Sequence, residues 1–230
     1  MSKEDIPPAP LDEPSAGPPA LVNDLHTSFA KHMKRALEFA IDDSETSLAW
    51  VDHYLQTLRG ETRRPILEVV AAEAGAYFGE VVRKEIGARW IGDGKDPRRL
   101  RLLLEPQFLH FSPIDQAYEV LLGEHMIEDD PRLPNTGALD PDFHPNESAP
   151  DVPGLPAEKS RLISDARWLA DALESRPQVT DREYYSLTGR FEMLQLLLEL
   201  LAQKCASEGR EPRKYQLSDY VSVLAATEDN

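Results

Sequence analysis

Hydrophobic residues recur at three- and four-residue steps in the first part of the chain, and this spacing predicts helices. The first predicted helix covers residues 21–42, and the second covers 43–60. Pro65 is a suitable first-turn residue for a third helix over 66–86, which Gly87 ends. The pattern therefore predicts a helical hairpin followed by one long helix.

Small residues recur at four-residue intervals inside the third predicted helix. Ala71, Gly75 and Gly79 form a stripe with little side-chain volume along one face. A glycine inside a helix costs about 1 kcal/mol relative to alanine, so we expect a compensating contact. The stripe therefore predicts close packing of this helix against another part of the backbone.

After the third helix the hydrophobic runs become short, and turn residues separate the first two of them. The runs cover 88–91, 100–104 and 108–111. They predict three short strands in an antiparallel meander. Ser112 as an N-cap and Pro113 as a first-turn residue then predict a short helix that ends at a glycine.

Helical periodicity returns in the C-terminal third of the chain. One helix is predicted over 162–173, and Thr180 with Glu183 forms a capping-box pattern that opens a long helix over 181–209. The apolar face of the long helix is broad, which predicts burial on more than one side. A last short helix is expected over 215–226.

Two proline-rich segments suggest how the chain is divided. Residues 1–19 contain six prolines among small and charged residues, and we expect them to form a disordered tail. Residues 129–156 contain seven prolines and several acids, which predicts a linker or a long surface loop. An α+β domain is expected at 20–128, and a C-terminal helical region at 157–226 either docks on it or forms a second lobe.

The predicted fold class is α+β and predominantly helical, with helices packed on a small three-stranded meander.

The chain has 25 Lys and Arg residues against 41 Asp and Glu residues, a formal net charge of -16. This charge disfavours nucleic acid and anionic membranes as partners and favours a basic protein. The single cysteine, Cys205, excludes an intramolecular disulfide, and the start of the chain has no signal-peptide pattern. We expect a cytoplasmic protein.

Motifs of known chemistry are missing from the sequence. The six histidines have no spacing typical of a zinc site. No P-loop, GxGxxG or GxSxG motif stands between a predicted strand and a predicted helix. The sequence therefore predicts no metal site, no cofactor and no known set of catalytic residues.

One face of the third predicted helix offers a candidate binding site. Glu73 and Glu80 are seven residues apart and share that face, and Tyr77 on the same helix is a further candidate binding residue. The two carboxylates could form an acid/base or cation site, or they could be a solvated face or pair with nearby arginines. Those arginines are Arg98, Arg99 and Arg101, which belong to the one local basic concentration in the chain.

The same region resembles a known group of proteins. Residues 74–82 read AGAYFGEVV, Trp90 follows in a predicted strand, and Ser112 and Pro113 open a helix. This combination resembles a set of small bacterial proteins of unknown function, some of whose relatives are toxin-immunity and other accessory proteins. The resemblance covers about 45–123 and implies no catalytic residues.

Three functional hypotheses follow. The first is an accessory, immunity-like or regulatory protein that binds a basic protein partner, because the charge is strongly negative and catalytic motifs are missing. The second is an enzyme with an unfamiliar site, which would need Glu73, Tyr77 and Glu80 to converge with the arginines in one pocket. The third is a homo-oligomeric structural protein that uses the surplus apolar face of the helix over 181–209.

Overall fold

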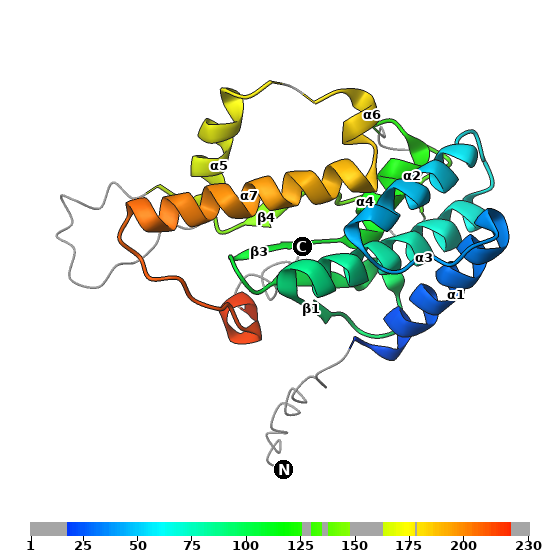
Figure 1. The fold of residues 1–230 in the computed structure, drawn as a ribbon, viewed down its shortest axis with the longest axis horizontal. Coiled ribbons are helices and arrows are strands. Elements are labelled where there is room, and N and C mark those ends of the chain that lie inside the picture. The colour runs from blue at the N-terminus through cyan, green and yellow to red at the C-terminus, as the bar shows by residue number, and fades with distance from the viewer. Residues whose placement is uncertain (1–17, 126–129, 135–137, 148–162, 178, 222–230) are drawn as a thin grey trace, which may run out of the picture.

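A computed structural model gives the fold of the chain, which is α+β and predominantly helical (Figure 1). Helices surround one small antiparallel sheet. The structure describes residues 18–125, 130–134, 138–147, 163–177 and 179–221. The predicted tail over 1–19 therefore lies almost entirely outside the described residues.

The N-terminal helices follow the predicted order with different boundaries. Helix α1 is Ala20–Leu37, a 3-10 turn occupies Glu45–Ser47, α2 is Leu48–Thr57, and α3 is Arg64–Val82. The first helix ends five residues earlier than predicted because Glu38 adopts a left-handed conformation with φ of 64°. Helix α3 packs against both α1 and the helix that follows the sheet.

The sheet has four antiparallel strands in the order β1-β2-β3-β4. A π-helical turn, Arg83–Gly87, connects α3 to β1, which is Ala88–Ile91. Strand β2 is Arg101–Leu104 and β3 is Leu109–Phe111, close to the predicted positions.

The prediction of a three-stranded meander is one strand short. Strand β4 is only His144–Pro145, and it pairs with Leu109 and His110 at the edge of the sheet. The imidazole rings of His110 and His144 stack with their centroids 5.0 Å apart, and His144 bonds to Asp140. A two-residue strand that contains proline leaves no strand pattern in the sequence, because proline is depleted in strands and tolerated at edges.

Helix α4, Pro113–Leu122, begins and ends as predicted. The Ser112 hydroxyl accepts a hydrogen bond from the backbone N–H of Asp115, and Gly123 closes the helix in a left-handed conformation with φ of 71°. The start of α4 lies against α3. A Cβ atom on Gly75 would be 2.6 Å from the Cα of Ile114, and one on Gly79 would overlap the indole ring of Trp90. Gly75 therefore allows close approach of the α4 backbone, and Gly79 leaves room for the side chain of Trp90.

The C-terminal region differs from the prediction of one long helix over 181–209. The capping box of Thr180 and Glu183 is present, but it opens only the four-residue α6, Asp181–Tyr184. Tyr185 leaves the helical conformation, and Ser186 caps a new helix by accepting from the N–H of Gly189. The continuous-helix prediction was therefore wrong.

Helix α7 has two sources of hydrogen-bond acceptors at its start. It spans Leu187–Ser207, and its first two N–H groups donate to the buried carboxylate of Asp52 in α2, at 2.6 and 3.0 Å. Acceptors from both Ser186 and Asp52 satisfy amides that a continuous helix would have bonded internally. This explains why the chain starts a second helix here.

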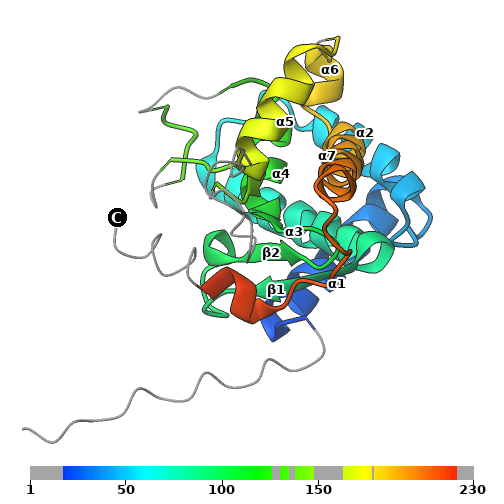
Figure 2. The same ribbon diagram turned by 90° about the vertical axis from the view of Figure 1, so that its left-hand side faces the viewer.

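The C-terminal helices share a core with the first half of the chain. Helix α7 packs against α2, α4 and α5, Asp165–Glu174, and Figure 2 shows α7 nearly end on among these neighbours. One cluster of buried hydrophobic side chains runs from α1 to α7. No helix in the described part of the chain is both long and apolar enough to cross a bilayer.

The last described residues pack on the sheet. Tyr220 stacks on Phe108, and its hydroxyl donates to the carbonyl of Leu104 at 2.7 Å. Residues 217–221 are helical, and the remainder of the helix predicted over 215–226 lies outside the described residues.

Candidate functional site

Glu73, Tyr77 and Glu80 lie on one face of α3, as their spacing predicts. All three side chains are buried, which the prediction of a solvated face did not anticipate. Each meets a different set of neighbours, so the face divides into a closed end at Glu80, a polar junction at Tyr77 and an open end at Glu73.

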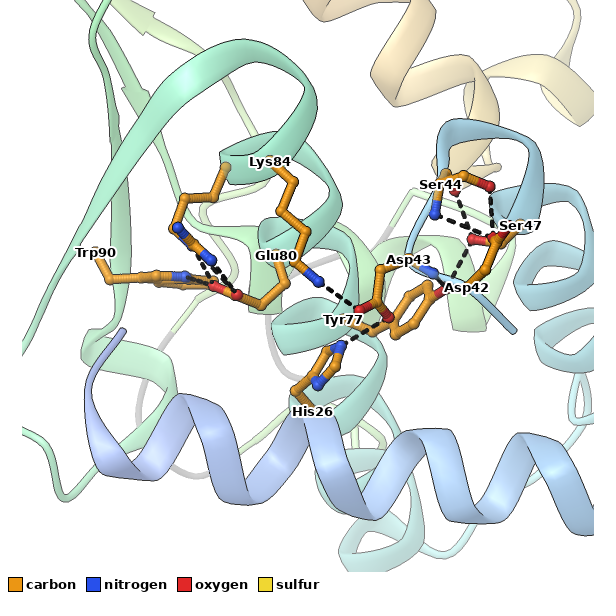
Figure 3. A network of polar contacts seen from close by, with 10 residues as sticks. His26, Asp42, Asp43, Ser44, Ser47, Tyr77, Glu80, Lys84 and Trp90 are labelled. Carbon is orange, nitrogen blue, oxygen red and sulfur yellow. Dashed lines mark hydrogen bonds and ion pairs between the residues drawn. The ribbon is translucent and has the colours of Figure 1, made fainter. Parts of the chain in front are cut away.

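The carboxylate of Glu80 is enclosed by charge-assisted hydrogen bonds. Arg83 donates to it through Nε and Nη2, each at 2.9 Å, and the indole N–H of Trp90 donates at 2.8 Å (Figure 3). The suggested pairing with Arg98, Arg99 or Arg101 is replaced by this bidentate contact with Arg83 from the next turn. Glu80 therefore joins the end of α3 to β1.

Tyr77 lies at a polar junction between helices. Its hydroxyl accepts from the backbone N–H of Asp43 at 3.0 Å and forms a hydrogen bond of 2.7 Å with Ser47 (Figure 3). Burial raises the pKa of Tyr77 to about 12. The ring stacks on His26 with a centroid separation of 5.4 Å, so Tyr77 joins α3 to both α1 and the 3-10 turn.

Asp43 completes this junction from a left-handed backbone conformation with φ of 59°. Its carboxylate bonds to His26 at 2.9 Å and to the ammonium group of Lys84 (Figure 3). Burial opposes ionisation of this carboxyl group, but the hydrogen bonds from Lys84 and His26 lower the pKa of Asp43. The junction connects the segment after α1 to the π-helical turn after α3.

Glu73 is held from α1 by two short hydrogen bonds. The Ser28 hydroxyl donates to one carboxylate oxygen at 2.6 Å, and Nδ1 of His32 lies 2.7 Å from the other. A carboxylate can only accept, so His32 carries its hydrogen on Nδ1, and Nε2 is the second ring nitrogen left for other contacts. The side chain of His32 is 42% exposed, while that of Glu73 is 7% exposed.

A pocket of about 420 Å³ opens beside Glu73 where α1, α2 and α3 meet. We call it the three-helix pocket. Its lining consists of His32, Arg35, Ala36, Tyr54, Val69, Val70 and Glu73.

The predicted group of arginines lies elsewhere, around the sheet and α4. Arg98 donates to Asp115 at 3.0 Å and to the carbonyl of Ala138 at 2.6 Å. Arg101 donates to backbone carbonyls and lies 3.7 Å from Asp140, whereas Arg99 is exposed and lies 3.6 Å from Asp93. Two of the three arginines thus hold the segment after residue 137 on the fold.

The partners of Glu73 were missed by sequence reasoning. Ser28 and His32 are one turn apart on an amphipathic helix, which is a weak signal that they share a face. Six residues of spacing would place His26 and His32 on roughly opposite sides of a helix, yet both contact residues of α3, His26 at Tyr77 and His32 at Glu73. Nothing in the sequence indicates which helix faces them.

Cys205 has the surroundings of a structural thiol. It is partly buried, its sulfur lies 3.7 Å from the side-chain oxygen of Gln107, and burial raises the pKa of the thiol. Within the described ranges, no group of three or more His, Cys, Asp or Glu side chains is arranged to hold a metal ion.

Comparisons with protein-family models, curated proteins and solved structures gave no match. The resemblance of residues 45–123 to small bacterial proteins therefore remains a prediction.

Proposed function

We propose that this protein is an accessory protein of the regulatory or immunity-like kind, which acts by binding a basic protein partner. The observation that carries the proposal is an exposed aromatic pair. Phe39 is 39% exposed and Trp50 is 48% exposed, and their rings meet edge to face with centroids 5.1 Å apart. Large exposed aromatic side chains, tryptophan above all, are typical anchors of protein interfaces.

Acidic side chains accompany this pair in the sequence and support a basic partner. Glu38, Asp42 and Glu45 are all exposed within the segment that joins α1 to α2. Hydrogen bonds from Ser44 lower the pKa of Asp42, which keeps this carboxylate charged. The net charge of -16 adds long-range attraction for a basic protein. We call Phe39, Trp50 and these three acids the aromatic surface.

The geometry gives less support to the other two hypotheses. The enzyme hypothesis needs Glu73 and Glu80 to converge in one pocket, but Glu80 is enclosed by Arg83 and Trp90. The oligomer hypothesis needs a free apolar face on α7, and the leucines of α7 pack against neighbouring helices of the same chain. The aromatic surface needs neither condition.

The first experiment is affinity purification of the tagged full-length protein from its native host, followed by mass spectrometry after a moderate salt wash. We expect one stoichiometric basic protein. The double variant Phe39→Ala/Trp50→Ala should lose it, with at least about tenfold weaker affinity for the purified partner in calorimetry.

The matched control is Val179→Ala, which truncates an exposed hydrophobic side chain (47% exposed) outside the aromatic surface. It should bind as the unaltered protein does, and circular dichroism should show that both variants fold. Equal retention of the partner by the double variant would reject the aromatic surface as the binding site.

A further inference from the structure

We infer that the three-helix pocket binds a carboxylate group of a small ligand, held by Arg35, Tyr54 and His32. This inference goes beyond the proposed partner binding and does not depend on it. The pocket and the aromatic surface are neighbours, because Tyr54 and Trp50 are one turn apart on α2.

Three polar groups that line the pocket are available to a ligand. Arg35 is exposed and has no ion pair or hydrogen bond within the described residues. The Tyr54 hydroxyl likewise has no hydrogen bond there, although its ring packs edge to face on Phe29. His32 uses Nδ1 for Glu73, which leaves Nε2 to contact a ligand. A few polar groups among apolar walls are typical of ligand sites.

Arg35 is the group in the pocket that is best suited to an anion. Its guanidinium has no ion pair in the described part of the chain, whereas the carboxylate of Glu73 is held by Ser28 and His32. Burial and the nearby charge of Glu73 raise the pKa of Tyr54, so its hydroxyl keeps its proton and can donate. A phosphate dianion would bring a second negative charge close to Glu73, which disfavours it.

The remaining walls specify an aliphatic substituent next to the carboxylate. Ala36, Val69 and Val70 supply these walls, and Val69 is 54% exposed, the largest exposed fraction among the large hydrophobic side chains described. The volume of about 420 Å³ lies within the usual range for small-molecule sites. A planar guanidinium matches a carboxylate with two parallel hydrogen bonds, which sets the end of the ligand that faces Arg35.

The test uses isobutyrate as the probe and isobutyramide as its neutral isostere. Each is titrated into the isotopically labelled full-length protein, and the backbone amide signals of residues 32–36 are followed by NMR. Saturable shifts with isobutyrate are expected, and isobutyramide should give none. Arg35→Met should weaken isobutyrate binding about tenfold, because a charge-assisted hydrogen bond is lost.

Lys34→Met is the matched control, since Lys34 is the adjacent cation on α1 and does not line the pocket. It should change the affinity less than twofold. Equal binding of the amide, unchanged binding in Arg35→Met, or no saturable shift at all would overturn the inference. No partner protein is present, so failure here is distinct from failure of the proposed function.

A second arm distinguishes the source of the carboxylate. N-acetyl-Ala-Val with a free C-terminus is compared with its C-terminal amide in the same titration. Tighter binding of the free peptide than of isobutyrate would assign the site to peptide C-termini, and weaker binding would assign it to free carboxylic acids. Both outcomes support a carboxylate site and specify its ligand.

Discussion

Glu73 and Glu80 lie two turns apart on the same face of α3 and are both buried, but the structure gives them different partners. At Glu80, Arg83 and Trp90 donate hydrogen bonds to the carboxylate and cover it from solvent. At Glu73, the contacts come from Ser28 and the half-exposed His32, and a pocket opens beside them. The residue type and the helix are the same, and only the covering elements differ.

This difference separates a stabilising contact from a site that can bind a ligand. A buried carboxylate with all its partners in place fixes β1 to α3 and leaves little room for another molecule. A carboxylate that orients a histidine at the rim of a pocket contributes less to the fold and leaves the second nitrogen of the ring accessible. Three substitutions on α3 test this division.

The largest effect is expected at the closed end. Glu80→Ala leaves the indole N–H of Trp90 and the guanidinium of Arg83 without their acceptor, and Trp90 is only 4% exposed. We expect the free energy of unfolding to fall by about 3 kcal/mol, measured by urea denaturation at pH 7. Glu68→Ala is the control, because Glu68 is a half-exposed carboxylate on the same helix and should cost less than about 0.5 kcal/mol. Similar losses in both variants would contradict the closed-end interpretation.

An intermediate effect is expected at the junction, and it appears only at alkaline pH. The folded state raises the pKa of Tyr77 to about 12, whereas an unfolded tyrosine has a pKa of about 10. The unfolded state therefore loses this proton first. The contribution of Tyr77 to the free energy of unfolding is fully present below pH 10 and is lost as the pH rises toward 12.

Tyr77→Phe removes this contribution. Between pH 8 and pH 11 the variant should lose about 1.4 kcal/mol less stability than the unaltered protein, measured by urea denaturation at both values. Tyr54→Phe is a useful comparison, because Tyr54 is only half-buried beside the pocket. Parallel losses in Tyr77→Phe and the unaltered protein would show that the Tyr77 hydroxyl is solvated.

The smallest effect is expected at the open end. Glu73→Ala removes the acceptor of Ser28 and His32, but both side chains are partly exposed and water can replace it. We expect a loss of about 1 kcal/mol in the same urea experiment. A loss as large as that of Glu80→Ala would mean that the two ends of α3 contribute equally to stability.

Local sequence signals predicted much of the fold. The hydroxyl of Ser112 caps α4 and Gly123 ends it because both signals act within a few residues. The same kind of signal predicted a long helix from Thr180, but the capping box there opens only one turn. The start of the next helix depends on Asp52, a residue far away in the chain, which accepts from the N–H of Leu187, and β4 likewise depends on pairing with β3 rather than on its own residues.

The candidate site was predictable only in part, for the same reason. Helical spacing placed Glu73 and Glu80 on one face of the helix. Their partners come from other elements: His32 is 41 residues from Glu73, and Asp43 is 34 residues from Tyr77. By contrast, Arg83 is only three residues from Glu80, which is close enough for a sequence pattern to suggest the pair.

The contact between Asp52 and α7 bears on the order in which the chain folds. Asp52 and Leu187 are 135 residues apart, so their hydrogen bond closes one of the longest loops in the protein. Helices α1 to α4 make mostly shorter-range contacts and can form before it, whereas α7 gains its capping carboxylate only when α2 is in place. We therefore expect docking of α7 to be a late step in folding, and pulse-labelling hydrogen exchange during refolding, followed at the amide of Leu187, would test this order.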